Sequence, residues 1–180
     1  MSRLLDLNYQ LAYYKAYHFH PKNVRIHLMC IPLIFLTAVI MAGAVDLGPV
    51  TLAQAGMIGY GIYYLLLDAG MGLVSLIFVF AAAYSSTFLH SHFPSSQVNL
   101  YALSVHVSGW IAQFFGHGYY EKRAPALLDN LIQPLVLAPY FVLWEIAFEF
   151  GYRRDLKRTM EKQAKQMRTD AERRRLNVNK

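Results

Sequence analysis

The sequence contains one cysteine, Cys30, among its 180 residues, and this excludes an intramolecular disulfide. We interpret Cys30 as a small buried hydrophobe, because it lies inside an apolar run. Charge is also scarce: 16% of the residues are charged, whereas a soluble domain usually carries about 25%. No Gly-x-Ser-x-Gly motif supports a serine nucleophile. Residues 1–25 lack the apolar core and the small-residue cleavage site of a signal peptide, so we expect no cleavable signal.

The charges that are present gather at the C-terminus. Residues 151–180 hold eleven Lys/Arg and four Asp/Glu, a net charge of +7. Because the whole chain carries +6, residues 1–150 carry −1. A nucleic-acid-binding protein would carry basic surface on its folded domain, so we expect no nucleic acid as a partner.

Four hydrophobic segments of about 18 residues follow one another with tight connectors. They cover residues 28–45, 50–67, 71–89 and 98–115, and none contains a Lys, Arg, Asp or Glu. A membrane-spanning helix needs about 20 mostly apolar residues, so these segments are at the short end. Helices of a soluble core would need polar faces, and these segments have almost none. The sequence therefore predicts an all-α fold, a multi-span transmembrane helix bundle embedded in a lipid bilayer.

Two further helices flank the predicted bundle. Residues 4–17 have the apolar spacing of a short amphipathic helix that lies at a membrane surface or against the body. Residues 131–150 are predicted to form a broken or re-entrant helix, because Pro134 and Pro139 interrupt them.

Lys/Arg residues flank both termini, which should therefore both be cytosolic. This requires an even number of spans, so we predict about four plus the re-entrant segment. The chain then divides into a membrane-embedded helical domain, residues 1–150, and a basic cytosolic tail with a helix, residues 151–180.

The histidines are the candidate metal ligands. Imidazole is the commonest metal ligand among side chains, and ionisable groups near membrane segments favour a functional interpretation. The predicted topology brings His18, His20, His27 and His117 to one membrane face. It puts His90 and His92 at the opposite face, where we expect no ligands.

His106, Trp110, Gln113 and His117 have the spacing of one helix face, and Glu121 extends it. His106 and His117 are separated by about 16 Å along a straight helix, too far apart to bind one ion. Either the helix breaks near Gly116 and Gly118, or only one of the two histidines is a ligand. Neutral imidazoles without thiolates suit zinc, iron or copper, and the composition leaves the metal open.

Two motifs, taken together, resemble a known family. His18, Pro21, Asn23 and His27 form H-x-x-P-x-N-x-x-x-H, and residues 106–127 read HVSGWIAQFFGHGYYEKRAPAL. In this order they resemble the fungal and bacterial family of small membrane proteins that includes the 2-hydroxy fatty acid dioxygenase of phytosphingosine breakdown. The resemblance covers about residues 8–152 and omits the basic tail.

The resemblance implies an iron-dependent, Fe(II) dioxygenase of the endoplasmic reticulum membrane. Such an enzyme uses dioxygen to shorten long-chain 2-hydroxy fatty acids by one carbon, without 2-oxoglutarate. The family's histidines correspond to His18, His27, His106 and His117, which we predict to bind iron. His20 is a less secure match.

Other residues near these motifs are candidates for substrate binding and catalysis. A cation should meet the substrate carboxylate. We expect Glu121 to orient His117 and, with Gln113, to take part in catalysis. The candidate substrate-binding residues are Arg25, Trp110, Lys122 and Arg123.

Three other functions remain open at this stage. A histidine-box hydroxylase or desaturase binds two metal ions and needs more histidines, some of them adjacent in the sequence. This chain has seven histidines, and no two of them are adjacent. A non-enzymatic, lipid-organising membrane protein would use its histidines only as hydrogen-bonding groups. A zinc-dependent lipid hydrolase would bind a different metal. The metal content of the purified protein separates these functions.

Overall fold

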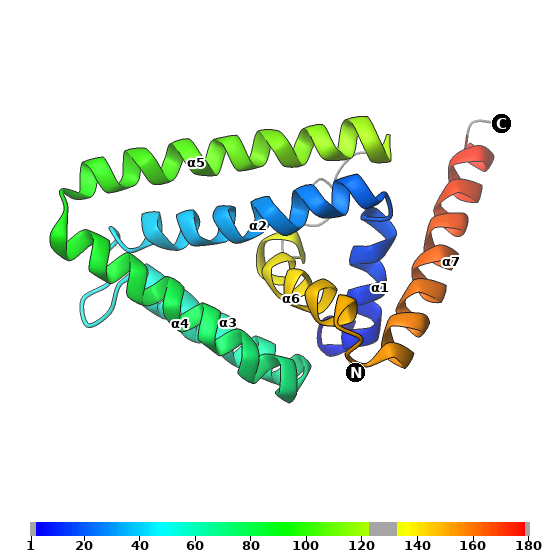
Figure 1. The fold of residues 1–180 in the computed structure, drawn as a ribbon, viewed down its shortest axis with the longest axis horizontal. Helices are drawn as coiled ribbons and strands as arrows, with labels where there is room; N and C mark the ends of the chain where they lie inside the picture. Colours follow the sequence, from blue (N-terminus) through cyan, green and yellow to red (C-terminus); the bar gives the residue numbers. More distant parts are fainter. Residues whose placement is uncertain (1–2, 123–132, 179–180) are drawn as a thin grey trace.

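The computed structural model describes residues 3–122 and 133–178, and every regular element in these two ranges is a helix (Figure 1). The all-α prediction is therefore confirmed. The α-helices are α1 (Leu7–Tyr17), α2 (Pro21–Ala42), α3 (Leu52–Leu67), α4 (Ala69–His92), α5 (Ser95–Gly116), α6 (Ala138–Glu149) and α7 (Arg154–Val178). A 3-10 turn, η1 (Arg3–Leu5), and two π-helical turns, η2 (His117–Glu121) and η4 (Gln133–Leu137), complete the set.

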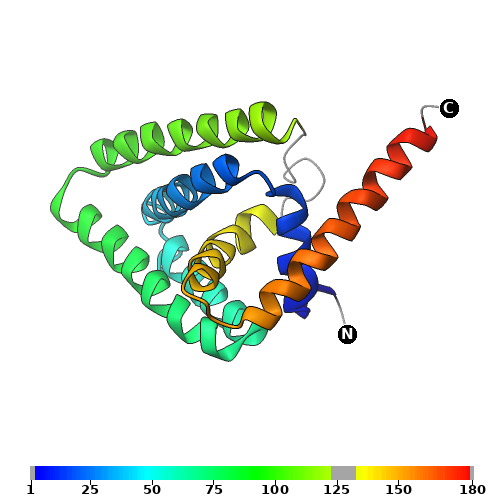
Figure 2. The same cartoon turned by 45° about the vertical axis from the view of Figure 1, so that its right-hand side comes forward.

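The helices enclose α6. Helices α2 and α5 run side by side in opposite directions, and the α3–α4 hairpin crosses beside them (Figures 1 and 2). The aromatic side chains of α6 fill the space between these layers: Tyr140, Phe141 and Trp144 are at most 1% exposed. Tyr64 of α3 stacks on Tyr140 with ring centroids 4.5 Å apart. Large aromatic side chains on α6 thus form the centre of the core.

Helix α1 confirms the predicted N-terminal helix and lies against the body. Asp6 caps it, because its carboxylate accepts a hydrogen bond from the Tyr9 backbone N–H at 3.1 Å. Lys15 forms an ion pair with Glu145 of α6 at 2.7 Å. The end of α1, which carries His18, is therefore anchored to the core helix.

Helix α2 begins seven residues earlier than the apolar segment predicted to start at Leu28. The reason is local: Pro21 occupies the first helical position, where no backbone donor is needed, and the His20 ring accepts a hydrogen bond from the Lys22 N–H at 3.2 Å. Hydrophobicity alone does not mark such a start. His27 consequently lies inside the helix, whereas Cys30, predicted to be buried, is half-buried.

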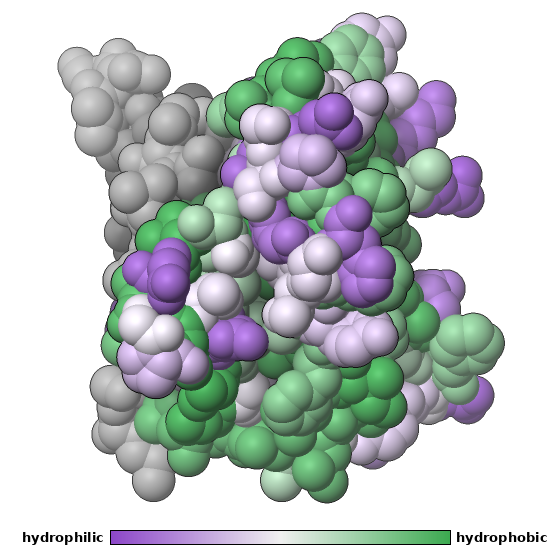
Figure 3. Space-filling view, turned by 90° about the vertical axis from the view of Figure 1, so that its left-hand side faces the viewer, coloured by the Kyte–Doolittle hydropathy of each residue, from purple (hydrophilic) through white to green (hydrophobic). Residues whose placement is uncertain are grey.

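Two of the described helices, α2 and α4, are long and apolar enough to cross a membrane; α3 is apolar but shorter. Large apolar side chains on the outer faces of α3, α4 and α5 are exposed, including Ile62, Ile77 and Ile111. In Figure 3, hydrophobic side chains border a central group of polar ones at the end where α4 meets α5. The count of four spans stays a prediction.

The segment predicted to be broken forms η4 followed by α6, and its first two residues lie outside the described ranges. Pro139 stands at the start of α6, so it removes no hydrogen bond from the helix interior. The predicted boundary at residue 150 falls in the turn before α7, where Gly151 has a φ of 80° that favours glycine. Helix α7 then packs along α1 through Met160 and Ala164, both at most 2% exposed.

Candidate metal centre

Three histidines from three different helices meet in the interior. His18 follows the last turn of α1, His27 lies in the second turn of α2, and His117 begins the π-helical turn after α5. Their ring centroids are 4.3 Å, 4.8 Å and 4.9 Å apart. One nitrogen from each ring lies within 4.8 Å of the other two, and all three side chains are buried. This spacing is suitable for three ligands around one metal ion.

A tight turn between α1 and α2 brings His18 over His27. His18 has left the helical conformation (φ −125°, ψ 72°), and Pro21 starts the next helix three residues later. The residue before a proline favours an extended conformation, and His20 is extended. The chain therefore reverses within a few residues, and this local sequence places the first two histidines together.

Two glycines of α5 allow the close helix contact that adds His117. A Cβ on Gly109 would lie 2.7 Å from Cγ1 of Ile34, and a Cβ on Gly116 would lie 2.3 Å from Oδ1 of Asn23. Real Cβ atoms essentially never approach other atoms this closely. The backbone of α5 can lie against α2 at these two positions because glycine has no side chain, and His117 follows directly.

Backbone carbonyls orient two of the three rings. Nδ1 of His18 lies 2.8 Å from the Tyr14 carbonyl oxygen, and Nδ1 of His27 lies 2.9 Å from that of Asn23. A carbonyl oxygen only accepts, so each Nδ1 carries the proton and donates it. In the neutral ring the Nε2 lone pair is then available to a metal.

The surroundings keep His18 neutral. Burial is the largest cause, followed by the neighbouring His27 and His117, and together they lower the pKa of His18 well below its usual range. Tyr14 stacks on the His18 ring with centroids 3.9 Å apart. A neutral imidazole is the form that binds metal, so this ring does not have to lose a proton before an ion can bind.

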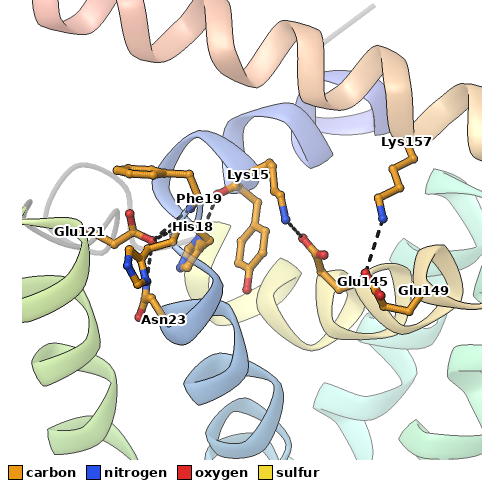
Figure 4. A network of polar contacts seen from close by, with 10 residues as sticks. Lys15, His18, Phe19, Asn23, Glu121, Glu145, Glu149 and Lys157 are labelled. Atoms are coloured by element: carbon orange, nitrogen blue, oxygen red, sulfur yellow. Dashed lines mark hydrogen bonds and ion pairs between the residues drawn. The ribbon is translucent and has the colours of Figure 1, made fainter.

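Glu121 is buried and holds the turn between α1 and α2 (Figure 4). Its Oε1 accepts hydrogen bonds from the backbone N–H groups of Phe19 and His20 at 3.0 and 2.9 Å, and from the Asn23 side-chain amide at 3.1 Å. The predicted contact with the His117 ring is not among its hydrogen bonds. Glu121 instead acts through Asn23, whose carbonyl orients His27.

His106 lies outside the group of three. Its Nε2 accepts a hydrogen bond from the Trp110 indole at 2.9 Å, and its Nδ1 lies 3.0 Å from the Thr37 hydroxyl and 3.2 Å from the Ile34 carbonyl oxygen. Helix α5 continues without a break to Gly116, so the rise along the helix separates His106 from His117. The structure does not bring this predicted ligand to the other three.

Of the predicted cationic contacts, Arg25 and Lys122 are not among the described residues that line the cavity. Arg25 and Lys122 are exposed, and Arg123 lies outside the described residues. His20 stacks on Tyr120 and caps α2. His90 and His92 stand in the last turn of α4, and Nε2 of His90 lies 2.9 Å from the Ile40 carbonyl oxygen.

A cavity of about 140 Å³ opens beside the three histidines. Trp110 and Gln113, both predicted site residues, line it together with His106. Its walls are mainly apolar, and no Lys, Arg, Asp or Glu occurs among the described residues that line it. The apolar lining residues come from α2, α5, η4 and α6 and include Ile31, Ile34, Phe35, Phe114, Leu135, Ala138 and Phe141.

Sequence reasoning missed the contributions of Tyr14, Asn23 and Gly116. Asn23 belongs to the motif that carries the resemblance, but the motif does not reveal its contact with Glu121. Tyr14 stands four residues before His18, a spacing that places a helical carbonyl within reach of the next ring. The Gly116 contact depends on how α2 and α5 pack, and no local pattern signals it.

These features define a helical protein class in which a buried three-histidine group faces an apolar cavity. Three imidazoles form a donor set that suits iron, zinc or copper and leaves coordination positions for other ligands.

The chain belongs to the Mpo1-like family, described as 2-hydroxy-palmitic acid dioxygenase Mpo1-like, whose profile matches residues 4–150. It is 39% identical over 162 residues to the 2-hydroxy-palmitic acid dioxygenase MPO1 of Saccharomyces cerevisiae. That alignment covers 88% of this chain and 89% of the yeast protein. No solved structure matches the chain. The family predicted from the two histidine motifs is thus confirmed.

Proposed function

We propose that this protein is an iron-dependent dioxygenase that shortens 2-hydroxy fatty acids by one carbon. The observation that carries the proposal is the group of His18, His27 and His117, buried beside an apolar cavity. The relationship to a yeast 2-hydroxy-palmitic acid dioxygenase supports both the substrate class and the use of dioxygen.

Iron would be held by the Nε2 atoms of His18 and His27 and by the His117 ring. The carbonyls of Tyr14 and Asn23 fix the first two rings in the tautomer that leaves Nε2 available. Iron bound there would supply the oxygen chemistry for cleavage between C1 and C2 of the substrate. The donor set fits such an ion because imidazole is a suitable ligand for iron.

The protein itself orients the substrate and limits water access. The apolar walls between α2, α5 and α6 receive the acyl chain, and the polar head then lies at the histidine end of the cavity. Glu121 fixes the turn that holds His18 and Asn23. These side chains act by positioning, and none of them needs to change its charge.

We further propose that the chain is embedded in the endoplasmic reticulum membrane with both termini cytosolic. Two apolar helices of suitable length, the exposed apolar side chains of α3, α4 and α5, and the basic tail support this arrangement. Epitope tags at each end should be accessible from the cytosolic side in intact microsomes. A tag that is reached only after permeabilisation would contradict this topology.

The function is tested by metal content together with activity. The full chain, purified in detergent and loaded with Fe(II) under anaerobic conditions, should retain about one iron per chain after desalting. On exposure to air it should convert 2-hydroxypalmitate to the acid shorter by one carbon. His18→Ala, His27→Ala and His117→Ala should lose iron and activity, whereas His92→Ala, a substitution of an exposed histidine, should retain both.

Two results would overturn the proposal. Wild-type protein that is folded but binds no metal would favour a lipid-organising role. Protein that binds zinc tightly, excludes iron and stays inactive toward 2-hydroxypalmitate in air would favour hydrolytic chemistry.

A further inference from the structure

Gln113 lines the cavity and carries a hydrogen-bond donor without a partner among the described residues. It stands one helical turn before His117, whose backbone N–H donates to the Gln113 carbonyl. Its side chain is 5% exposed and lines the same cavity as the three histidines. The Nε2 atom is buried and has no hydrogen-bond partner among the described residues. Burying an amide N–H without a partner costs free energy, so its position favours a ligand that accepts its hydrogen bond.

Several other donors along the cavity wall already have partners. The Trp110 indole donates to His106 at 2.9 Å, and the Tyr60 hydroxyl donates to the Leu135 carbonyl oxygen at 2.9 Å. Nδ1 of His18 and of His27 donates to backbone carbonyls. No Lys or Arg lines the cavity within the described part of the chain. The protein groups that meet a carboxylate in this space are therefore neutral donors close to the histidines.

We propose that the Gln113 side-chain amide binds the carboxylate of the 2-hydroxy acid and makes the site select free acids over their neutral esters. The inference rests on the proposed function and deepens it, because it identifies how the substrate head is recognised. Gln113 and His117 lie one turn apart on the same helix face, so one substrate head can reach both the amide and the histidine group.

The amide accounts for selection as well as binding. A carboxylate accepts a hydrogen bond from a neutral N–H more strongly than an ester carbonyl does, because the acceptor is charged. Because no Lys or Arg is among the described residues that line the cavity, the carboxylate contacts made by these residues fall to neutral donors such as this amide. Tyr14 is the other donor to consider: it lines the cavity, and burial, followed by Glu145, raises the pKa of its hydroxyl, which stays protonated.

The test measures binding of an acid and its ester to matched variants. The full chain loaded with Fe(II) is kept anaerobic to prevent turnover, and the dissociation constants of 2-hydroxypalmitate and methyl 2-hydroxypalmitate are determined. Gln113→Met removes the amide at similar volume. Gln97→Met is the control, since Gln97 is exposed on the same helix.

Gln113→Met should weaken acid binding about 10- to 100-fold, the range for a lost hydrogen bond to a charged group, and should leave ester binding nearly unchanged. Iron content should remain that of the wild type. The unliganded variant should be as thermally stable as the wild type or more so, because a buried donor without a partner has been removed. A purely structural glutamine would instead show a lower melting temperature and equal losses for both ligands.

Three results would overturn the inference while the proposed function stands. These are unchanged acid affinity in Gln113→Met, equal weakening of acid and ester, and loss of acid selectivity in Tyr14→Phe with none in Gln113→Met. If wild-type protein neither binds nor shortens 2-hydroxypalmitate, the proposed function fails, and the inference fails with it. The two failures are therefore distinguished by the wild-type result.

Discussion

Gly116 lies so close to Asn23 that a Cβ on residue 116 would be 2.3 Å from the Asn23 Oδ1 atom. Asn23 is fully buried, and its backbone carbonyl orients His27 while its side-chain amide donates to Glu121. The contact therefore joins the end of α5, from which His117 follows, to the part of α2 that positions His27.

Gly116→Ala should separate these two helices. Because the nearest obstacle is a buried side chain held by Glu121, we expect a loss of about 1–3 kcal/mol in the free energy of unfolding, typical of overpacking. Iron content should fall as well. Gly118→Ala is the matched control, since a Cβ on Gly118 meets nothing within 4 Å. Chemical denaturation and metal analysis of both variants measure the difference, and equal behaviour would show that the contact is not needed.

Glu121→Ala should disrupt the turn between α1 and α2. It leaves the N–H groups of Phe19 and His20 and the Asn23 amide without their common acceptor. We expect a loss of about 2–4 kcal/mol of stability, since buried donors would be left unpaired. Iron affinity should fall about 10- to 100-fold, as for residues that orient metal ligands.

Glu149→Ala is the comparison for Glu121→Ala. Glu149 is exposed and pairs with Lys157 at 3.4 Å, so its loss should change stability by about 0.5 kcal/mol or less. Glu121→Gln keeps an acceptor oxygen, so its loss of stability should lie between those of Glu121→Ala and Glu149→Ala. If Glu121→Ala kept wild-type iron affinity, the carboxylate would not be a positioning group for the histidines.

His106→Phe should retain stoichiometric iron, unlike His27→Ala or His117→Ala. Both His106 nitrogens are engaged with Trp110, Thr37 and Ile34, and the ring lies outside the group of three. We expect the variant to alter the packing of the cavity and therefore the binding of acyl chains. If His106→Phe lost iron while its melting temperature stayed that of the wild type, His106 would be a metal ligand after all.

Met160→Ala should weaken the packing of α7 against α1. Met160 is 2% exposed and belongs to the main core, and truncation of such a side chain costs about 2–5 kcal/mol. Since His18 directly follows α1, iron affinity should decrease with stability. Lys162→Ala removes an exposed side chain of the same helix and should have little effect. Similar thermal unfolding of the two variants would indicate that α7 does not support the site.

Local sequence patterns predicted several parts of this structure. Pro21 and the histidine spacing around it indicated a turn and a ligand pair, because a proline at a helix start restricts the preceding residue. The broken or re-entrant helix predicted from Pro134 and Pro139 stays a prediction, since η4 leads directly into α6. Other local details were predicted wrongly, such as the start of α2, because an apolar run marks burial or membrane depth and not the helix cap.

Which histidines meet could not be derived from spacing. His106 and His117 share one face of α5, and the sequence left open whether a helix break would bring both to one ion. The answer depends on the crossing of α2 and α5 at Gly109 and Gly116, where absent side chains allow close packing. The same packing brings the carboxylate of Glu121 to the α1–α2 turn, about 100 residues earlier in the chain.

The sequence by itself determined the helical class, the scarcity of charge in residues 1–150, the family, and the local pairing of His18 with His27. These follow from composition and from contacts a few residues apart, which propensity and capping control. Only the tertiary structure decided that His117 and not His106 joins them, that Glu121 holds the turn, and that Gln113 lines the cavity with no partner for its Nε2 atom among the described residues. Such contacts join distant segments, and they depend on side-chain volume and helix crossing, which no local pattern records.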